Sequence, residues 1–261
     1  MKSNEKYIIA LSVYNSYQNL QNILIDIKKS SFNNLIKKII IVDNNSEETL
    51  TNKIKLIKYL SRKYKKKIKL IVNNKNYGLG GSQKILFNSL KKEKFTYLIN
   101  AHTSGRYKII NQLKFIKKTK KYNYIIGSRF LNKEATKNYS LLRKTFNLFF
   151  IKLTRLATGC KLSDPGSAIY IVSKKLLFKI IPVANNLTDY SHFNHLLNAI
   201  IYKEDSFIFE FSMNWKEGNI KSHLNPINYI AILFLSLASF YFSKNFYKIK
   251  KVNFKFKTYL F

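Results

Sequence analysis

The chain has 261 residues, which is enough for one large hydrophobic core or for one domain with an appendage. Hydrophobic residues make up 46% of it, too many for a disordered chain and too few for a polytopic membrane protein. The formal net charge of +34 raises the question of a polyanionic partner: a nucleic acid, an anionic membrane surface or a phosphorylated substrate.

The excess of lysine has a second explanation in codon usage. Lys, Asn, Ile, Tyr and Phe are abundant together and all have A/T-rich codons, so a genome of skewed base composition would give the same charge. The lysines are spread along the whole chain, and arginines, which fork onto phosphates, are few. We therefore expect no nucleic-acid partner. The single Cys160 excludes an internal disulfide and fits a reducing cytoplasm.

The first half of the chain alternates short β-branched runs with longer amphipathic stretches. Residues 7–13 form a short apolar run, predicted to be a buried strand rather than part of a signal peptide, and residues 17–27 are predicted to be a helix. Further strands are predicted at 36–43, 68–73, 97–101 and 124–127, and further helices at 47–64, 82–90 and 109–118. Continuous apolar strands separated by helices are typical of an α/β fold with a mainly parallel central sheet and helices on both faces.

Polar residues gather at the predicted carboxyl ends of these strands, where parallel sheets bind their ligands. They are Tyr14, Asn15, Asp43, Asn44, Asn73, Asn74 and residues 102–106. In the second half the pattern is less regular: helices are predicted at 143–158 and 191–202, a turn at 161–167, and strands at 168–172 and 207–213.

Residues 221–261 are predicted to be a separate C-terminal segment after a domain of residues 1–220. No charged residue lies between Lys221 and Lys244, and the apolar centre, residues 227–242, is flanked by lysines on both sides. At about 1.5 Å per residue this centre is shorter than a bilayer core of roughly 30 Å. We therefore expect a C-terminal apolar helix that associates with an anionic membrane surface, followed by a basic tail. The alternative is a helix buried in the domain core or in a dimer interface.

Four segments resemble family 2 glycosyltransferases, especially the branch with dolichyl-phosphate mannose synthase and its bacterial relatives. Residues 8–15 (IIALSVYN) resemble an opening strand that ends in P-x-Y-N, and residues 39–46 (IIIVDNNS) resemble V-D-D/N-x-S. Residues 76–82 (NYGLGGS) are similar to N-x-G-x-G-x-A, and residues 127–130 (GSRF) to G-S-R. Their order and spacing agree over the first two-thirds of the chain. The resemblance implies a GT-A fold and a sugar transfer from a nucleotide-diphospho-sugar.

Asp43 ends a predicted buried strand, where a carboxylate can accept hydrogen bonds from a nucleobase or a ribose hydroxyl. The resemblance implies that role. We expect the position to belong to the site and not to the core, so that its loss leaves the fold intact. The alternative is a helix cap, for which Ser46 is the better candidate. Gly78 and Gly80 let the backbone approach a ligand closely, or simply permit a tight turn.

Asp164 stands in a segment that resembles the family's D-x-x-x-G/S, whose aspartate lies near the acceptor and is a candidate base. An inverting transfer needs a group that takes the acceptor proton or orients the acceptor oxygen. The alternative is a turn aspartate that precedes Pro-Gly.

The chain departs from the family at the metal site. The family usually carries H-x-D-G-Q-Y after the fourth strand, whereas residues 102–107 read HTSGRY, with Ser104 at the aspartate and Arg106 at the glutamine. No carboxylate is left there to hold Mg²⁺ or Mn²⁺. Arg106 can fork onto two phosphate oxygens and so replace the cation, with His102 beside it. A second departure places His195 where the family often has an acidic residue; a helix histidine without a catalytic role is the simpler interpretation.

The sequence thus predicts a family 2-like, inverting glycosyltransferase. Catalysis is assigned to Asp164 and Arg106, and nucleotide-sugar binding to Tyr14, Asn15, Asp43, Asn44, Gly78, Gly80, His102, Ser104 and Arg129. No metal ligand is predicted, although Mg²⁺ or Mn²⁺ stays a possible cofactor. The expected acceptor is a polyprenyl phosphate or a cell-surface glycan at the cytoplasmic face of a bacterial inner membrane, with the protein peripheral or monotopic. The rivals are a catalytically degenerate binding protein of the same fold and a basic nucleic-acid-binding protein.

Overall fold

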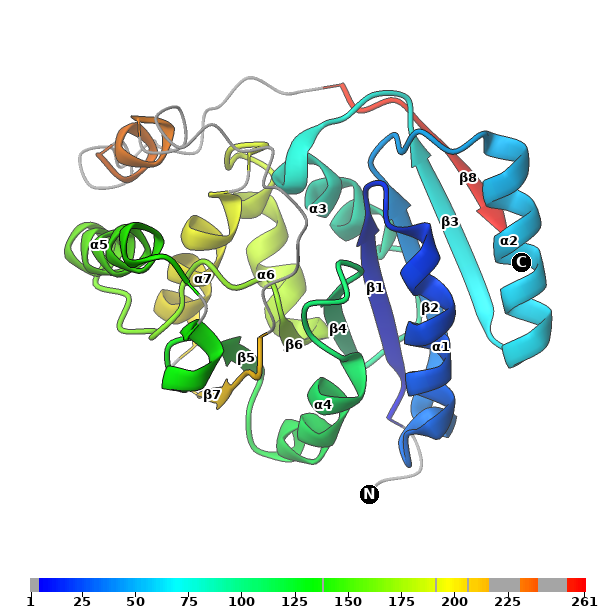
Figure 1. The fold of residues 1–261 in the computed structure, drawn as a ribbon, viewed down its shortest axis with the longest axis horizontal. Helices are drawn as coiled ribbons and strands as arrows, with labels where there is room; N and C mark the ends of the chain where they lie inside the picture. Colours follow the sequence, from blue (N-terminus) through cyan, green and yellow to red (C-terminus); the bar gives the residue numbers. More distant parts are fainter. Residues whose placement is uncertain (1–4, 138, 191, 206, 216–230, 239–252) are drawn as a thin grey trace.

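A twisted eight-stranded sheet runs through the molecule (Figure 1). The computed structural model describes residues 5–137, 139–190, 192–205, 207–215, 231–238 and 253–261. The strand order is β7-β5-β6-β4-β1-β2-β3-β8. The strands are β1 (Tyr7–Val13), β2 (Ile36–Asp43), β3 (Lys67–Asn73), β4 (Tyr97–His102), β5 (Tyr124–Ser128), β6 (Tyr170–Ser173), β7 (Ile208–Ser212) and β8 (Phe256–Leu260).

The centre of the sheet is parallel, as the sequence predicts. β1 pairs in parallel with β2 and β4, and β2 with β3. The register sets Val13 opposite Asp43, and Ser12 opposite His102, so the carboxyl ends of three strands meet at one edge. β6 runs antiparallel to β4 and β5, and β7 is parallel to β5.

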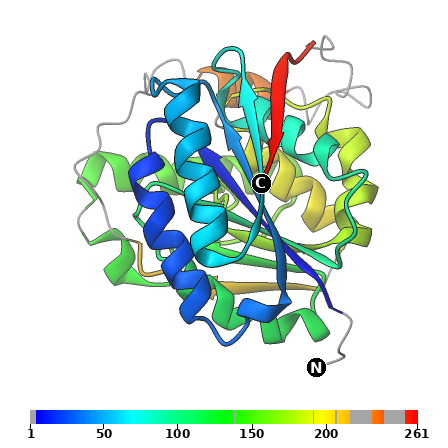
Figure 2. The same ribbon diagram turned by 90° about the vertical axis from the view of Figure 1, so that its right-hand side faces the viewer.

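Helices cover both faces of the sheet. One face carries α1 (Leu20–Lys29), α2 (Leu50–Tyr64) and the short α4 (Ile109–Leu113); Figure 2 shows α1 and α2 side by side in front of the strands. The other face carries α3 (Gly78–Ser89), α6 (Lys174–Ala184) and α7 (Phe193–Glu204). The alternation along β1 creates the two cores: Ile8 and Ala10 pack with the second helix group, and Ile9 and Leu11 with the first.

The two longest helices begin at side-chain caps and end in left-handed residues. Thr49 accepts a hydrogen bond from the Asn52 amide at the start of α2, and the helix ends at Lys65 with φ 49°. The predicted cap, Ser46, does not start this helix, which therefore begins later than expected. Ser140 caps α5 (Leu141–Thr158), and Gly159 ends it with φ 73°. Short 3₁₀ turns fill the remaining connections: η1 (Tyr17–Asn19), η2 (Asn33–Leu35), η3 (Lys114–Lys120) and η4 (Lys133–Thr136).

The C-terminal segment differs from the prediction where the structure describes it. Residues 231–238 are helical, and Leu233 and Leu237 lie buried in the core that α3, α6 and α7 share. Among the described residues no helix has both the length and the apolar character needed to cross a membrane. The rest of the apolar stretch at 221–244 lies outside the described residues, and the division at residue 220 stays a prediction.

The predicted basic tail is in part a strand of the central sheet. β8 pairs antiparallel with β3, and Lys69 lies opposite Leu260. The pairing satisfies the backbone groups of β3, which would otherwise form an open sheet edge. Residues 256–260 therefore belong to the same sheet as β1, β2 and β3.

Candidate active site

An open cavity of about 500 Å³ lies at the edge where β1, β2 and β4 end. Six of the residues predicted from the sequence line it: Tyr14, Asn15, Asn44, Gly78, His102 and Ser104. Tyr190, from the loop before α7, lines it as well. Five predicted residues are not part of this lining: Asp43, Gly80, Arg106, Arg129 and Asp164.

The loops after β1 and β2 are tied to each other. Asn15 has φ 49°, a left-handed conformation that asparagine tolerates better than most residues. Its backbone amide donates to Ser46 Oγ at 3.0 Å, and its side-chain oxygen accepts from the Glu47 amide at 2.9 Å. The asparagine predicted to touch a ligand therefore also shapes the loop that presents it.

Asp43 lies behind the cavity and not in its wall. The residue is fully buried, and its Oδ2 lies 2.8 Å from Lys53 Nζ. Its Oδ1 accepts hydrogen bonds from the backbone amide and the hydroxyl of Ser46. The expectation that this position lies outside the core was wrong, because the strand end is closed by α2 and its Lys53. Lys53 and Ser46 thus contact both carboxylate oxygens. A contact between Asp43 and the nucleoside stays a prediction.

Asn44 joins the end of β2 to the glycine-containing segment. Its side-chain nitrogen donates to Asn76 Oδ1 at 2.6 Å and to the Gly78 carbonyl at 3.2 Å. Its side-chain oxygen accepts from the Tyr77 amide and from Asn73 Nδ2. These four bonds hold the two loops that form one side of the cavity.

The glycines at the start of α3 make room for another part of the chain. A methyl group at Gly78 would collide with the backbone carbonyl of Asp189, and one at Gly80 with that of Thr188. The amides of Gly80 and Gly81 donate to the Asp189 carbonyl at 2.8 and 3.2 Å. The first amides of α3 are therefore satisfied by the loop that carries Tyr190, and only Gly78 of these three glycines borders the cavity.

His102 ends β4 and faces the cavity as a neutral imidazole. Burial in the surrounding protein lowers its pKa to about 4, and the positive charges of Arg129 and Arg106 add to the effect. At neutral pH it can exchange hydrogen bonds with a ligand but brings no positive charge. The loop after it is fixed, because Thr103 Oγ1 donates to the Ser12 carbonyl at 2.8 Å and Asn19 Nδ2 to the Thr103 carbonyl at 2.7 Å.

Ser104 lines the cavity at the position of the family's metal aspartate. Its hydroxyl oxygen is buried and has no hydrogen-bond partner among the described residues. Arg106 follows two residues later, outside the lining, and is near enough to His102 to help lower the pKa of its imidazole.

Asp164 is held by Arg129 in a two-point contact. Arg129 Nε and Nη2 donate to the two carboxylate oxygens, each at 2.7 Å, and the Arg129 backbone amide donates at 3.1 Å. Asp164 is buried. Burial alone would lower the pKa of Arg129, but the Asp164 carboxylate raises it above its ordinary value, so the guanidinium stays charged. Three of the hydrogen bonds that this carboxylate accepts therefore come from one residue, Arg129.

Trp215, after β7, connects this ion pair with the cavity. Its ring lies 6.0 Å from that of His102 and 5.8 Å from the Arg129 guanidinium carbon. His195, in α7, lies near the same ion pair, with Nδ1 3.1 Å from Thr154 Oγ1; burial lowers its pKa to about 4, while Asp164 raises it and Arg129 lowers it further. Sequence reasoning missed Trp215 and Tyr190. The one available signal was that Trp215 is the single tryptophan of the chain and follows a predicted strand.

The described residues do not form a site for a divalent metal ion. None of the described residues that line the cavity is an Asp or Glu, and the part of the chain that the structure describes holds no group of three or more His, Cys, Asp or Glu side chains that would bind such an ion. Hard cations such as Mg²⁺ and Mn²⁺ need at least one carboxylate in such a site.

The sequence matches the model of glycosyl transferase family 2 over residues 8–180. The chain belongs to this family. It is accordingly a glycosyltransferase that uses a nucleotide-sugar donor, and the family is consistent with an inverting transfer. No curated protein matches the sequence. Membership in the dolichyl-phosphate mannose synthase branch stays a prediction.

Two solved structures of glucosyl-3-phosphoglycerate synthase from Mycobacterium tuberculosis are similar in fold. The complex with uridine diphosphate has a TM-score of 0.57 and 12% identity, and the match covers 92% of this chain and 79% of that one. The complex with Mn²⁺, uridine diphosphate and glucosyl-3-phosphoglycerate has a TM-score of 0.56 and 11% identity, with 99% and 88% covered. Both support the GT-A fold.

Proposed function

We propose that this glycosyltransferase moves a sugar from a nucleotide-diphospho-sugar to a lipid-linked phosphate acceptor, without a divalent metal. The observation behind the proposal is the cavity at the ends of β1, β2 and β4. The described residues that line it bring amides, hydroxyls and a neutral imidazole but no carboxylate. Complexes of the similar M. tuberculosis enzyme with uridine diphosphate support a nucleoside diphosphate as the ligand of this fold.

The donor is held by polar groups of different strand ends. Tyr14 and Asn15 offer hydroxyl and amide groups that recognise a base and a ribose, and Asn44 holds the two loops that present them. The diphosphate lies toward Ser104 and His102, and Arg106 supplies the positive charge that a metal ion would bring. In metal-dependent transfer the ion offsets the charge of the leaving diphosphate; here the guanidinium takes that role.

The transfer breaks the bond between the sugar C1 and the β-phosphate oxygen, and the electron pair leaves with the nucleoside diphosphate. An acceptor oxygen forms the new bond at C1 from the opposite side. A hydroxyl acceptor must lose its proton to a base, and Asp164, the base predicted from the sequence, is already engaged by Arg129. A phosphate acceptor is ionised at neutral pH and needs no base. The geometry therefore favours a polyprenyl phosphate over a glycan hydroxyl, with Asp164 and Arg129 orienting the acceptor.

Radiolabelled transfer tests the proposal. The full-length protein is incubated with UDP-, GDP-, CDP- and dTDP-sugars and with either a polyprenyl phosphate or the corresponding polyprenol. We expect labelled sugar to appear in the lipid fraction with one of the donors when polyprenyl phosphate is the acceptor. This transfer should also occur when a chelator removes divalent metal ions. Transfer to the polyprenol alone, or no nucleotide-sugar binding at all, would contradict the proposal; the second result would favour a degenerate binding protein.

A further inference from the structure

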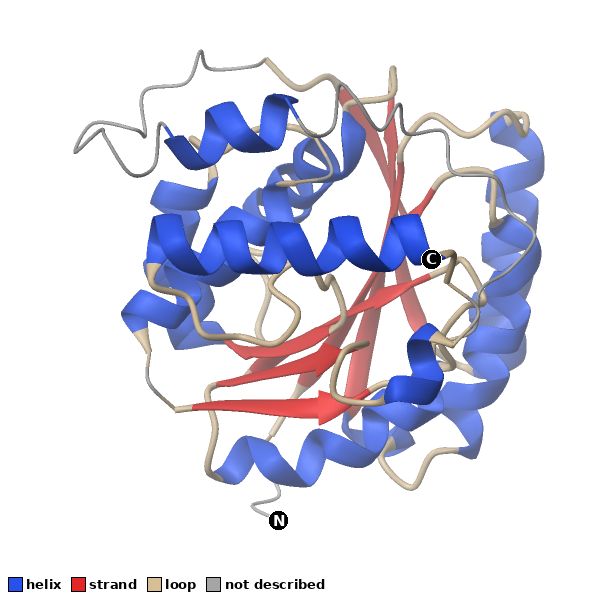
Figure 3. Cartoon of the chain, turned by 60° about the vertical axis from the view of Figure 1, so that its left-hand side comes forward, coloured by secondary structure: helices blue, strands red, loops and turns tan. Residues whose placement is uncertain are grey.

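The outer surface of α5 is unusually apolar for an exposed helix. Figure 3 shows α5 lying across the front of the molecule with the helix at 231–238 beside it. Six of the sixteen large hydrophobic side chains that the described residues expose belong to α5, and two more to residues 231–238. They are Leu141, Leu142, Phe146, Leu148, Phe149 and Leu156, together with Phe234 and Leu235.

The apolar side chains of α5 form a continuous stripe. Leu142, Phe146, Phe149, Leu153 and Leu156 are spaced by four, three, four and three residues, which places them on one side of a helix. Leu142, Phe149 and Leu156 are 67%, 51% and 80% exposed. Leu153, in the middle of the stripe, packs partly against the core, whereas the other four side chains of the stripe are exposed.

The buried side of α5 consists of other residues. It is formed by Phe150, Ile151, Thr154 and Thr158. Residues 231–238 repeat the arrangement, because Leu233 and Leu237 are buried in the core whereas Phe234 and Leu235 are 56% and 64% exposed. Both helices thus have their own core contacts and still present large apolar side chains outward.

The charges beside the stripe are all positive. Lys144, Lys152 and Arg155 are exposed on the flank of α5, Arg143 stands near its start, and the helix contains no acidic residue. A partner of this surface must accept apolar side chains and bring negative charge. An anionic lipid bilayer has both properties at its headgroup level.

We propose that α5 and residues 231–238 form a membrane-docking surface that lies on an anionic bilayer. A second copy of the chain fits less well, because a symmetric contact through α5 would place its cations against the same cations. The proposal gives a reason for a lipid-linked acceptor but does not depend on catalysis, since vesicle binding is measured without donor or acceptor.

The test must separate this surface from the general attraction of a protein with net charge +34 to anionic vesicles. Full-length protein is sedimented with phosphatidylcholine vesicles that contain phosphatidylglycerol, in low salt and in about 1 M salt, where charges are screened beyond about 3 Å. Phe149→Gln/Leu156→Gln removes two apolar side chains of the stripe. Leu131→Gln/Phe207→Gln is the matched control, with side chains 51% and 60% exposed elsewhere.

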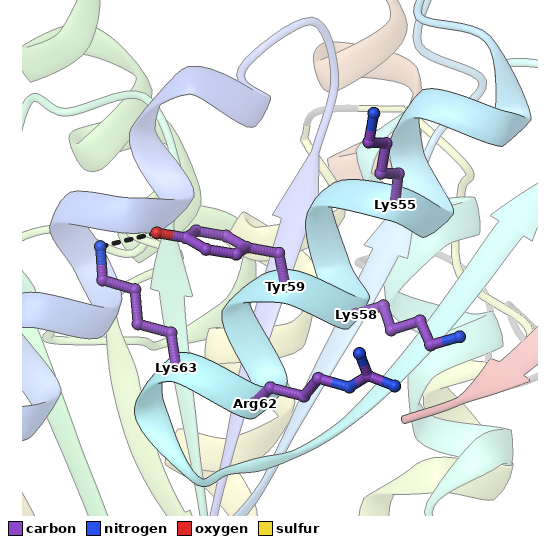
Figure 4. Close-up of a pocket in the computed structure, with 5 residues that line it drawn as sticks. All are labelled: Lys55, Lys58, Tyr59, Arg62 and Lys63. Carbon is purple, nitrogen blue, oxygen red and sulfur yellow. Dashed lines mark hydrogen bonds between the residues drawn. The ribbon is translucent and has the colours of Figure 1, made fainter.

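We expect the α5 apolar variant to bind vesicles roughly tenfold more weakly at both salt concentrations, and the control to bind like wild type. The charge variant Lys152→Gln/Arg155→Gln should lose binding at low salt. Its control is Lys58→Gln/Arg62→Gln, the same change on α2, where these residues line a basic surface depression with Lys55, Tyr59 and Lys63 (Figure 4). That control should lose less vesicle binding at low salt than Lys152→Gln/Arg155→Gln.

Two results would overturn the proposal. One is equal vesicle binding by the α5 apolar variant and its control. The other is a wild-type dimer in sedimentation velocity that the α5 apolar variant dissociates, which would assign the surface to a second copy. Truncation after Ser222 is a poorer test, because it also removes β8 and the buried Leu233 and Leu237.

Discussion

Asp43 and Asp164 are both buried carboxylates in ion pairs, but their surroundings differ. The Asp43–Lys53 pair is closed on both sides, with side chains 0% and 5% exposed. The Asp164 side chain is also buried, but its partner Arg129 is 17% exposed, and the Arg129 guanidinium lies over the ring of Trp215. The difference indicates that Asp43 supports the loops of the cavity from behind, whereas Arg129 of the second pair is partly accessible, as the proposed contact with an acceptor requires.

The largest effect is expected from removing the carboxylate of the closed pair. Asp43→Ala leaves Lys53 buried without its partner and should destabilise the fold by about 3–5 kcal/mol. Glu134→Ala is the control, because the Glu134–Lys137 pair is exposed and its loss should cost about 0–1 kcal/mol. Urea unfolding of both variants measures the difference; equal stability would place Asp43 outside the core after all.

A smaller loss, with a different signature, is expected at the open pair. Arg129→Lys keeps the charge but loses the two-point contact with Asp164, a cost of about 1.5–3 kcal/mol in stability. The rate of transfer should fall at least about tenfold, with little change in donor affinity. Arg155→Lys, on the exposed side of α5, is the control. A variant with normal transfer and reduced stability would make the Asp164–Arg129 pair purely structural.

The smallest effect concerns His102. Because its pKa is lowered to about 4, the imidazole is neutral from pH 8 down to about pH 6, and nucleotide-sugar affinity should stay constant over that range. The intact nucleotide sugar is the right ligand, since free nucleoside diphosphates titrate near pH 6 themselves. Affinity that rises as the pH falls through about 6.5 would show that His102 binds the diphosphate as a cation.

The fold was largely predictable because its central strands are continuous apolar runs. β1 and β2 were predicted with their observed bounds, and β3 to β5 within one residue at each end. β8 was missed because Lys255 and Lys257, before and within it, resemble part of a solvated tail, and because its partner, β3, lies far away in the sequence. α6 was missed as well: its apolar run is short and contains Pro182, which is usually disfavoured inside a helix.

The site was predictable only in part. Spacing placed Asn15, Asn44 and His102 at strand ends, and the structure brings all three to one cavity. No pattern could reveal that Arg129 engages Asp164 across 35 residues. Nor could a local motif show that Gly80 packs on Thr188, because that contact depends on where the loop before α7 returns to α3.

Metal-free donor binding is the central claim, and calorimetry with the selected nucleoside diphosphate tests it most directly. Wild-type protein should bind the ligand with similar affinity in a chelator and in Mg²⁺ or Mn²⁺. Arg106→Ala should weaken binding by roughly ten- to a hundredfold, which corresponds to a charge-assisted contact of about 1.5–3 kcal/mol. The nucleoside alone should bind both proteins equally, and Arg106→Lys should restore only part of the loss. A strict metal requirement, or equal losses for nucleoside and nucleoside diphosphate, would contradict the account.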